Sequence, residues 1–97
     1  MKTVDEIKGI LTQNKEALRQ RYKVKALGIF GSCVRGEQGK KSDVDLLVEF
    51  EEPIGLFEFM ELEETLEDML GTKIDLVSRK ALKPHIGEQI LLEVVYV

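Results

Sequence analysis

The sequence predicts an α/β (α+β) protein: a short mixed β-sheet of about three strands with helices packed on it. Two observations support this fold class. Apolar residues recur at helical spacing in some segments and alternate with polar residues in others, and the two kinds of segment follow one another along the chain. Strands separated by helices favour a parallel or mixed sheet that those helices cover. The 97 residues are enough for one core, so we expect a single domain spanning residues 1–97.

The first half of the chain is expected to supply one long helix and two strands. Thr3 and Glu6 have the spacing of a capping box, in which each side chain bonds the other residue's backbone amide, so a helix should begin there. Gly36 and Gly39 interrupt the periodic patterns and indicate a turn and a loop. The expected elements are a helix at 3–22, a strand at 25–31, a helical turn at 32–36, a loop at 37–42 and a strand at 43–50.

The second half is expected to supply two helices and a third strand. Gly71 follows an amphipathic stretch and should end the first of these helices, and Pro84 suits the first turn of the second. The expected elements are a helix at 56–70, a strand at 73–78 and a helix from 84 to about 94. In the first helix we expect Leu56, Phe59, Met60 and Leu66 in the core, with Phe57 and Met69 exposed.

Composition limits the function classes that the chain can serve. The formal net charge is −4, whereas broad electrostatic binding of nucleic acid needs a basic surface. No apolar run approaches the ~20 residues that span a bilayer, and the first ten residues lack the apolar core of a signal peptide. Cys33 is the only cysteine, so no intramolecular disulfide can form. We therefore expect a cytoplasmic protein that binds neither membranes nor nucleic acid directly.

Three aspartates are candidates for a metal site. Asp43 and Asp45 lie two apart on an expected strand, so both side chains leave the same face, with Cα atoms about 6–7 Å apart. Asp75, between two apolar residues of the third strand, should also point away from the core. If these two strands are neighbours, three carboxylates meet, and a divalent cation would relieve their repulsion. Oxygen-only ligands favour Mg²⁺ or Mn²⁺.

A candidate phosphate site precedes these aspartates. Gly31 and Ser32 end one strand and begin a helical turn, where free backbone amides and the Ser32 hydroxyl can bind phosphate oxygens. Arg35, one turn later, can hold a phosphate or an acidic partner. Each feature alone has an ordinary explanation: a Gly-Ser pair is often a turn, and strand aspartates are often solvated surface acids. Their joint occurrence in this order favours metal-assisted chemistry at phosphorus.

The motif resembles the signature of the minimal nucleotidyltransferases in the DNA polymerase beta-like superfamily. It reads Gly31-Ser32-x-x-Arg35-Gly36, followed by Ser42-Asp43-Val44-Asp45-Leu46-Leu47-Val48. The resemblance covers almost the whole chain and implies the nucleotidyltransferase fold. It implies that Mg²⁺ is held by Asp43 and Asp45, with Asp75 in the place of a third acid, and that the nucleoside triphosphate is bound by Gly31, Ser32, Arg35 and Ser42. Whether Asp75 binds a second metal ion or takes the proton of the acceptor hydroxyl is left open.

Within that superfamily the chain is similar to the MntA-type antitoxins. The resemblance implies an adenylyltransferase that uses ATP to modify a tyrosine of a HEPN-domain toxin and so neutralises it, in a hetero-oligomer with that toxin. The short chain has no room for an acceptor-binding domain, which agrees with an acceptor on another protein. Two alternatives stay open: a non-catalytic module that blocks its partner sterically, and a small-molecule nucleotidyltransferase that works with a separate acceptor-binding subunit. The sequence does not choose the nucleotide base or the acceptor atom.

Overall fold

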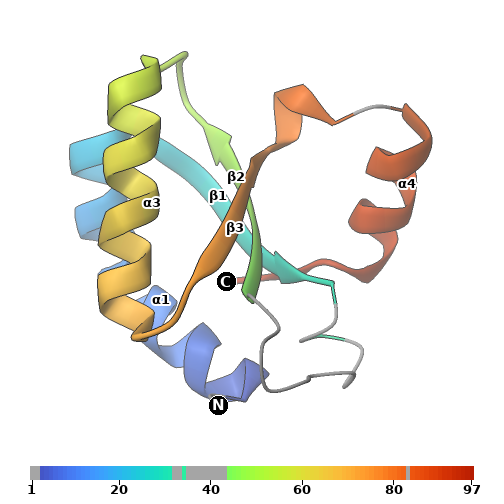
Figure 1. The fold of residues 1–97 in the computed structure, drawn as a ribbon, viewed down its shortest axis with the longest axis horizontal. Helices are drawn as coiled ribbons and strands as arrows, with labels where there is room; N and C mark the ends of the chain where they lie inside the picture. The colour runs from blue at the N-terminus through green and yellow to red at the C-terminus, as the bar shows by residue number, and fades with distance from the viewer. Residues whose placement is uncertain (1–2, 32–33, 35–43, 83) are drawn as a thin grey trace.

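The computed structural model describes residues 3–31, 34, 44–82 and 84–97, without the side chains of residues 84–86 (Figure 1). The elements follow the expected alternation of helix and strand. In chain order they are α1 (Val4–Tyr22), β1 (Val24–Phe30), β2 (Val44–Phe50), α3 (Leu56–Leu70), β3 (Ile74–Ser78), the 3-10 helix η1 (Arg79–Ala81), α4 (Pro84–Glu93) and β4 (Val95–Tyr96). The helical turn and loop expected at 32–42 lie almost entirely outside the described residues.

The sheet is mixed, as predicted, and its order is β3-β2-β1-β4. β1 runs antiparallel to β2 and to β4, whereas β2 and β3 are parallel. The prediction of about three strands missed β4, a two-residue strand that pairs with β1. Two residues are too short to show any alternation in the sequence. Its end is fixed by two hydrogen bonds, in which Val97 N donates to Leu27 O (2.9 Å) and Lys15 Nζ donates to Val97 O (2.9 Å).

Local sequence signals place the ends of the two long helices. Thr3 Oγ1 accepts from Glu6 N (3.2 Å) and Glu6 Oε1 accepts from Thr3 N (3.3 Å), so the predicted capping box is present. α3 ends at Gly71, whose φ of 66° is the left-handed conformation that glycine adopts without strain. None of the helices in the described part of the chain is both long and apolar enough to cross a bilayer.

The main core lies between one face of the sheet and the pair α1 and α3, which Figure 1 shows side by side on that face. The two helices are joined by Tyr22, whose hydroxyl lies 2.9 Å from Thr65 Oγ1 and donates to Glu61 Oε1 (3.2 Å). The fully buried residues of this core are apolar and come from α1, β1, β2 and α3: Ile7, Leu11, Leu18, Val24, Leu27, Ile29, Val44, Leu46, Val48, Leu62, Leu66 and Leu70.

The other face of the sheet is not simply open to solvent. Figure 1 shows α4 on the opposite side of the sheet from α1 and α3. Leu47, which alternation places on this second face together with Asp45, is only 1% exposed, and Phe30 is 7% exposed. Both lie outside the main core cluster. The face that carries the candidate site is therefore partly apolar and partly enclosed.

The predicted inner face of α3 is wrong at three positions. Leu56 and Met60 are 71% and 52% exposed, although we expected them in the core. The buried stripe is Leu62, Leu66 and Leu70. At about 100° per residue, Leu56 and Met60 point about 120° and 160° away from Leu62, which explains their exposure. Met69 lies almost in line with that stripe and is half-buried against the core rather than exposed, while Phe57 is exposed as predicted.

Candidate active site

The strand register brings two of the predicted acids together. Asp45 of β2 is the Cα partner of Phe30 on β1 and of Asp75 on β3. Because neighbouring strands lie about 4.8 Å apart and paired residues share a face, the two carboxylates are adjacent on one side of the sheet. Asp75 is exposed and Asp45 is half-buried. The condition on which the acids were expected to meet, that the second and third strands are neighbours, is therefore satisfied.

Gly31, directly after β1, lies against the Asp45 side chain. Its φ is 80°, a left-handed conformation that side-chain-bearing residues rarely adopt. A Cβ atom at this position would overlap an Asp45 carboxylate oxygen and lie 2.8 Å from Asp45 Cγ. Glycine is therefore required on two grounds, backbone conformation and space. The sequence predicted that the Gly31 turn and Asp45 lie close together, and the structure shows why only glycine fits at this position.

A further acid, Glu93, reaches the same turn from α4. Gly31 N donates to Glu93 Oε1 at 3.0 Å, so this amide is engaged by a carboxylate. The sequence motifs predicted neither the contact nor the residue. The two residues are 62 apart in the chain, and Glu93 belongs to no motif. Glu93 lies beside Gly31 because β4 pairs with β1, a pairing that no sequence pattern predicts.

Four predicted site residues lie outside the described part of the chain: Ser32, Arg35, Ser42 and Asp43. Cys33 does too. Within the described part, no group of three or more carboxylate, histidine or cysteine side chains is close enough to hold a metal ion. The predicted three-carboxylate site therefore stays a prediction. The pair that is described, Asp45 and Asp75, offers oxygen donors side by side, a donor set that fits a hard divalent cation.

Further acids surround this end of the sheet. The pKa of the Glu63 carboxyl on α3 is raised, first by its partial burial and then by the negative charges of Glu67, Asp75 and Glu64. The part of this shift that comes from the neighbouring carboxylates indicates negative potential around Glu63 and Asp75. That potential favours the approach of a cation to Asp75.

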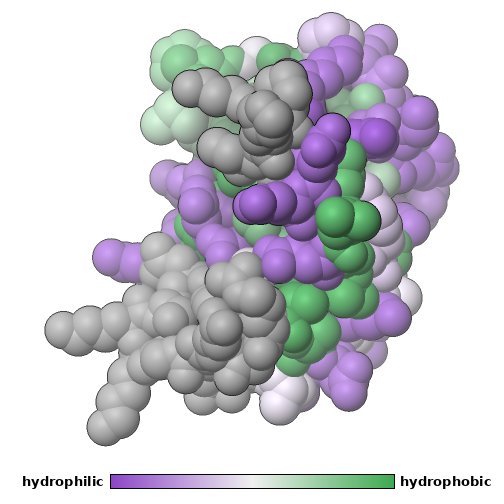
Figure 2. All heavy atoms as spheres, turned by 90° about the vertical axis from the view of Figure 1, so that its right-hand side faces the viewer, coloured by the Kyte–Doolittle hydropathy of each residue, from purple (hydrophilic) through white to green (hydrophobic). Residues whose placement is uncertain are grey.

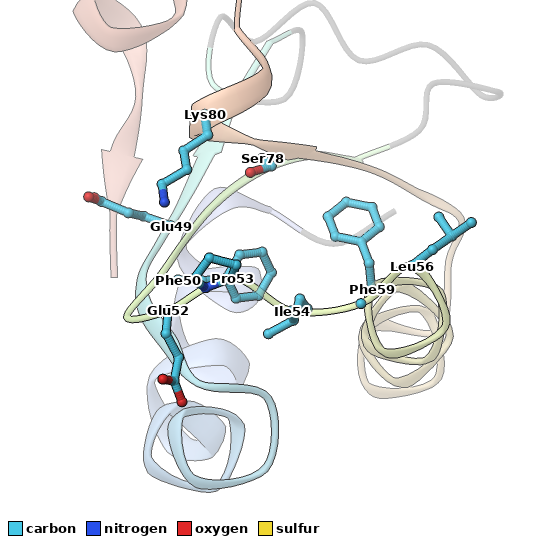
Figure 3. A pocket seen from close by; sticks show the side chains of 10 residues that line it. Glu49, Phe50, Glu52, Pro53, Ile54, Leu56, Phe59, Ser78 and Lys80 are labelled. Atoms are coloured by element: carbon cyan, nitrogen blue, oxygen red, sulfur yellow. The ribbon is translucent and has the colours of Figure 1, made fainter.

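An apolar pocket in the described part of the chain lies elsewhere. A cavity of about 320 Å³ is lined by Phe50, Pro53 and Phe59, with Glu49 and Ser78 at its edge (Figure 3). Figure 3 shows side chains from the end of β2, the following loop and the start of α3 around it. Asp45 lies five residues before Phe50 on β2, which corresponds to about 17 Å of strand. The pocket is therefore not part of the candidate site.

Apolar side chains are exposed on α4, the helix that supplies Glu93. Figure 2 views the molecule from this side and shows hydrophobic side chains at the surface among hydrophilic ones. Leu92 is 88% exposed and Leu91 is 39% exposed, and both line a shallow depression together with Glu88. Single exposed leucines are common on protein surfaces. Two exposed leucines in succession beside a site offer contact area for another molecule.

Comparison with known proteins identifies the class as a nucleotidyltransferase, which agrees with the fold. Residues 11–97 match the model of the nucleotidyltransferase domain family. The protein adenylyltransferase MntA of Thermococcus cleftensis is 53% identical over 97 residues, which cover all of this chain and 98% of that protein. The chain therefore belongs to the nucleotidyltransferase family and is a minimal nucleotidyltransferase enzyme related to the MntA protein adenylyltransferases.

Solved structures show the same fold. One, named "putative minimal nucleotidyltransferase", is 35% identical with a TM-score of 0.74, and the match covers 92% of this chain and 93% of that one. A chain in the complex of tri-AMPylated Shewanella oneidensis HEPN toxin with MNT antitoxin is 19% identical with a TM-score of 0.67. That match covers 93% of this chain and 70% of the other. The four-stranded mixed sheet with its helices is thus the minimal nucleotidyltransferase fold.

Proposed function

We propose that this protein transfers AMP from ATP to a hydroxyl group, a tyrosine, of a HEPN-domain toxin and so acts as its antitoxin. The observation that carries the proposal is the position of Asp45, packed against the Gly31 turn on one side and paired with Asp75 on the other. A glycine turn beside adjacent carboxylates suits a triphosphate and a divalent cation.

Each residue has a stated task in this proposal. Gly31, Ser32, Arg35 and Ser42 bind and orient the triphosphate. Asp43 and Asp45 are the ligands for Mg²⁺, for which Mn²⁺ can substitute, and Asp75 is either a further metal ligand or the base that takes the hydroxyl proton. The metal, when bound, neutralises charge on the phosphates. The adjacency of Asp45 and Asp75, with their oxygen-only donor set, supports this assignment.

The reaction is a displacement at phosphorus. The acceptor hydroxyl oxygen forms a bond to the α-phosphorus of ATP, the bond from that phosphorus to the bridging oxygen of the β-phosphate breaks, and pyrophosphate leaves. The hydroxyl proton passes to a base, which is Asp75 if that residue is not a metal ligand. Because no covalent enzyme intermediate is needed, the rate enhancement comes from positioning and charge stabilisation.

A protein acceptor is supported by the relatives and by an exposed apolar surface near the site. The MntA relative is named a protein adenylyltransferase, and the Shewanella oneidensis complex contains an AMPylated HEPN toxin. The exposed Leu91 and Leu92 beside the site offer a contact surface for such a partner. We place the reaction in the cytoplasm, in agreement with the single cysteine, Cys33, and the acidic, membrane-independent chain.

Mass spectrometry of the acceptor tests the proposal. Wild-type protein, ATP and Mg²⁺ should add one or more adenylates to a HEPN protein from the same organism. Asp45→Asn should abolish the product, because the variant keeps the shape but loses a charged ligand. Asp68→Asn, an exposed position on α3, is the matched control and should transfer normally. If the Asp45→Asn variant transfers as much AMP as the wild type does, the proposal is wrong.

The exposed apolar surface also favours a second candidate, steric neutralisation without chemistry. Leu92 is 88% exposed and can contact a partner whether or not transfer takes place. The same Asp45→Asn variant separates the two functions. If it binds the toxin and protects growing cells as well as the wild type does, steric capture is sufficient. If it binds but no longer protects, transfer is required. A labelled metabolite in place of labelled protein would instead indicate a small-molecule acceptor.

A further inference from the structure

The backbone around Glu93 is held in a fixed relation to β1. Val94 N donates to Ile90 O (2.9 Å) and closes the last turn of α4. Immediately afterwards Val95 and Tyr96 pair with Ile29 and Gly28 of β1. Glu93 therefore stands two residues before a paired strand residue, next to the end of the strand that Gly31 follows. The position of the Glu93 Cα atom relative to β1 is therefore restricted.

The Gly31 peptide is consequently held from two sides. Asp45 lies against its Cα atom, and the half-buried Glu93 accepts a hydrogen bond from its amide at 3.0 Å. Glycine reaches a φ near 80° without strain but is open to many other conformations, so these contacts select one orientation of a flexible residue.

We propose that Glu93 is a positioning residue for nucleotidyl transfer: its carboxylate orients the Gly31 peptide and thereby fixes the turn that binds the triphosphate. This inference rests on the proposed function, since it assumes that the Gly31 turn receives the nucleotide. Glu93 acts through Gly31, so what matters is an oxygen acceptor at the right distance and not a negative charge as such. The same carboxylate would need its charge if it acted as a metal ligand or as a base.

Two variants separate reach from charge. Glu93→Gln keeps an oxygen acceptor at the same distance without the charge, whereas Glu93→Asp keeps the charge but shortens the side chain by one methylene. Under the proposal, Glu93→Gln keeps the KM for ATP within about threefold of the wild type. Glu93→Asp and Glu93→Ala raise it by about tenfold, the size expected for a lost hydrogen bond of this kind. Glu88→Ala, exposed on the same helix, is the control and should leave KM unchanged.

The amide signal of Gly31 in a ¹H–¹⁵N spectrum gives a readout independent of catalysis. It should stay near its wild-type position in Glu93→Gln and move in Glu93→Asp and Glu93→Ala. The proposal is overturned if Glu93→Gln loses ATP affinity as Glu93→Ala does, which would show that charge is needed. It is also overturned if the Gly31 signal stays in place in all variants. If Glu93→Ala does not fold, the comparison of Gln with Asp decides alone.

The failure of this inference can be told from failure of the proposed function. In a titration of the protein with ATP in the presence of Mg²⁺, Asp45→Asn should weaken ATP binding whether or not Glu93 has a positioning role. If Asp45→Asn weakens binding and the Glu93 variants do not, only the positioning role fails. If neither changes ATP binding, the nucleotide does not bind at this turn, and both claims fail.

Discussion

At position 31 only glycine meets both the backbone requirement and the space requirement. Its φ is 80°, and a Cβ atom would overlap the Asp45 carboxylate. Gly71 shares the first requirement only, because its φ is 66° and a Cβ atom there would meet nothing within 4 Å. The two glycines therefore allow backbone strain to be separated from displacement of Asp45.

Replacing each glycine with alanine tests this difference. Both Gly31→Ala and Gly71→Ala should lower the free energy of unfolding by about 1–2 kcal/mol, because both place a Cβ atom in the left-handed region. Only Gly31→Ala should also abolish nucleotidyl transfer, because its Cβ atom pushes Asp45 away. Urea denaturation measures the first effect and product formation the second. Full activity in Gly31→Ala would show that the Asp45 position is not needed.

At the residue scale, the sequence predicted what depends on local pattern. Gly31 is recognisable because it precedes Ser32 at a strand end, and Asp45 and Asp75 because each interrupts an apolar strand. The structure confirms that these three meet or pair. Glu93 was not predictable, since its role depends on the long-range register of β4 on β1. The roles of Ser32, Arg35, Ser42 and Asp43 stay predictions.

At the scale of elements, ends were easier to predict than faces. The bounds of α3 agree with prediction because Gly71 stops the helix and Pro53 and Gly55 precede it. Its buried stripe was misjudged because the helix has more apolar residues than the sheet can cover, and periodicity alone does not say which are left out. β4 was missed for the opposite reason, since a two-residue strand exists only through its partner.

The close approach of β4 to β1 depends on Gly28. A Cβ atom there would overlap the Val94 Cγ2 methyl and lie 3.3 Å from Tyr96 Cδ1. We expect Gly28→Ala to cost about 1–3 kcal/mol of stability, as overpacking does. Adding Val94→Ala removes the overlapping methyl, so the double variant should lose less than the sum of the single changes, by 0.5 kcal/mol or more on the scale of about 0.5–3 kcal/mol for residues in contact. Additive losses in urea denaturation would contradict the contact.

The acidic residues around Glu63 on α3 predict a pH dependence of stability. The pKa of Glu63 is raised above its ordinary value of 4.5, chiefly by burial and then by Glu67, Asp75 and Glu64. An acid whose pKa is higher in the folded state favours folding when protonated, and that contribution is lost as the pH rises through the raised pKa. Glu63→Gln should therefore be slightly more stable than wild type at pH 7, by no more than about 0.5 kcal/mol for a surface position.

Thermal unfolding at several pH values checks this expectation. The gain from Glu63→Gln should shrink as the pH falls through the raised pKa of Glu63 and should be gone below 4.5, where the wild-type carboxyl is protonated in the folded and unfolded states alike. Glu88→Gln, exposed on α4, serves as a control for the general effect of removing one negative charge. A Glu63→Gln variant that is less stable than wild type at pH 7 would show that the carboxylate makes a favourable contact instead.

At the scale of the whole molecule, the two faces of the sheet have separate tasks. One face packs against α1 and α3 and forms the core, and the other carries Asp45, Asp75 and the α4 side of the site (Figure 1). The alternation of helices and strands predicted the fold class, and the resemblance of the motif from Gly31 to Asp45 predicted the family; both predictions are confirmed. What surrounds the site, including Glu93 and the buried Leu47, required the packing of α4.

The central claim is that Gly31, Asp45 and Asp75 form one site for a divalent cation and ATP. Paramagnetic broadening by Mn²⁺ in the presence of ATP tests it directly, because the effect falls steeply with distance from the ion. The ¹H–¹⁵N signals of these three residues should broaden first, while those of Glu49 and Ser78, at the far ends of β2 and β3, stay sharp. Broadening that is strongest at Glu49 and Ser78, or that spares Asp45 and Asp75, would contradict the account.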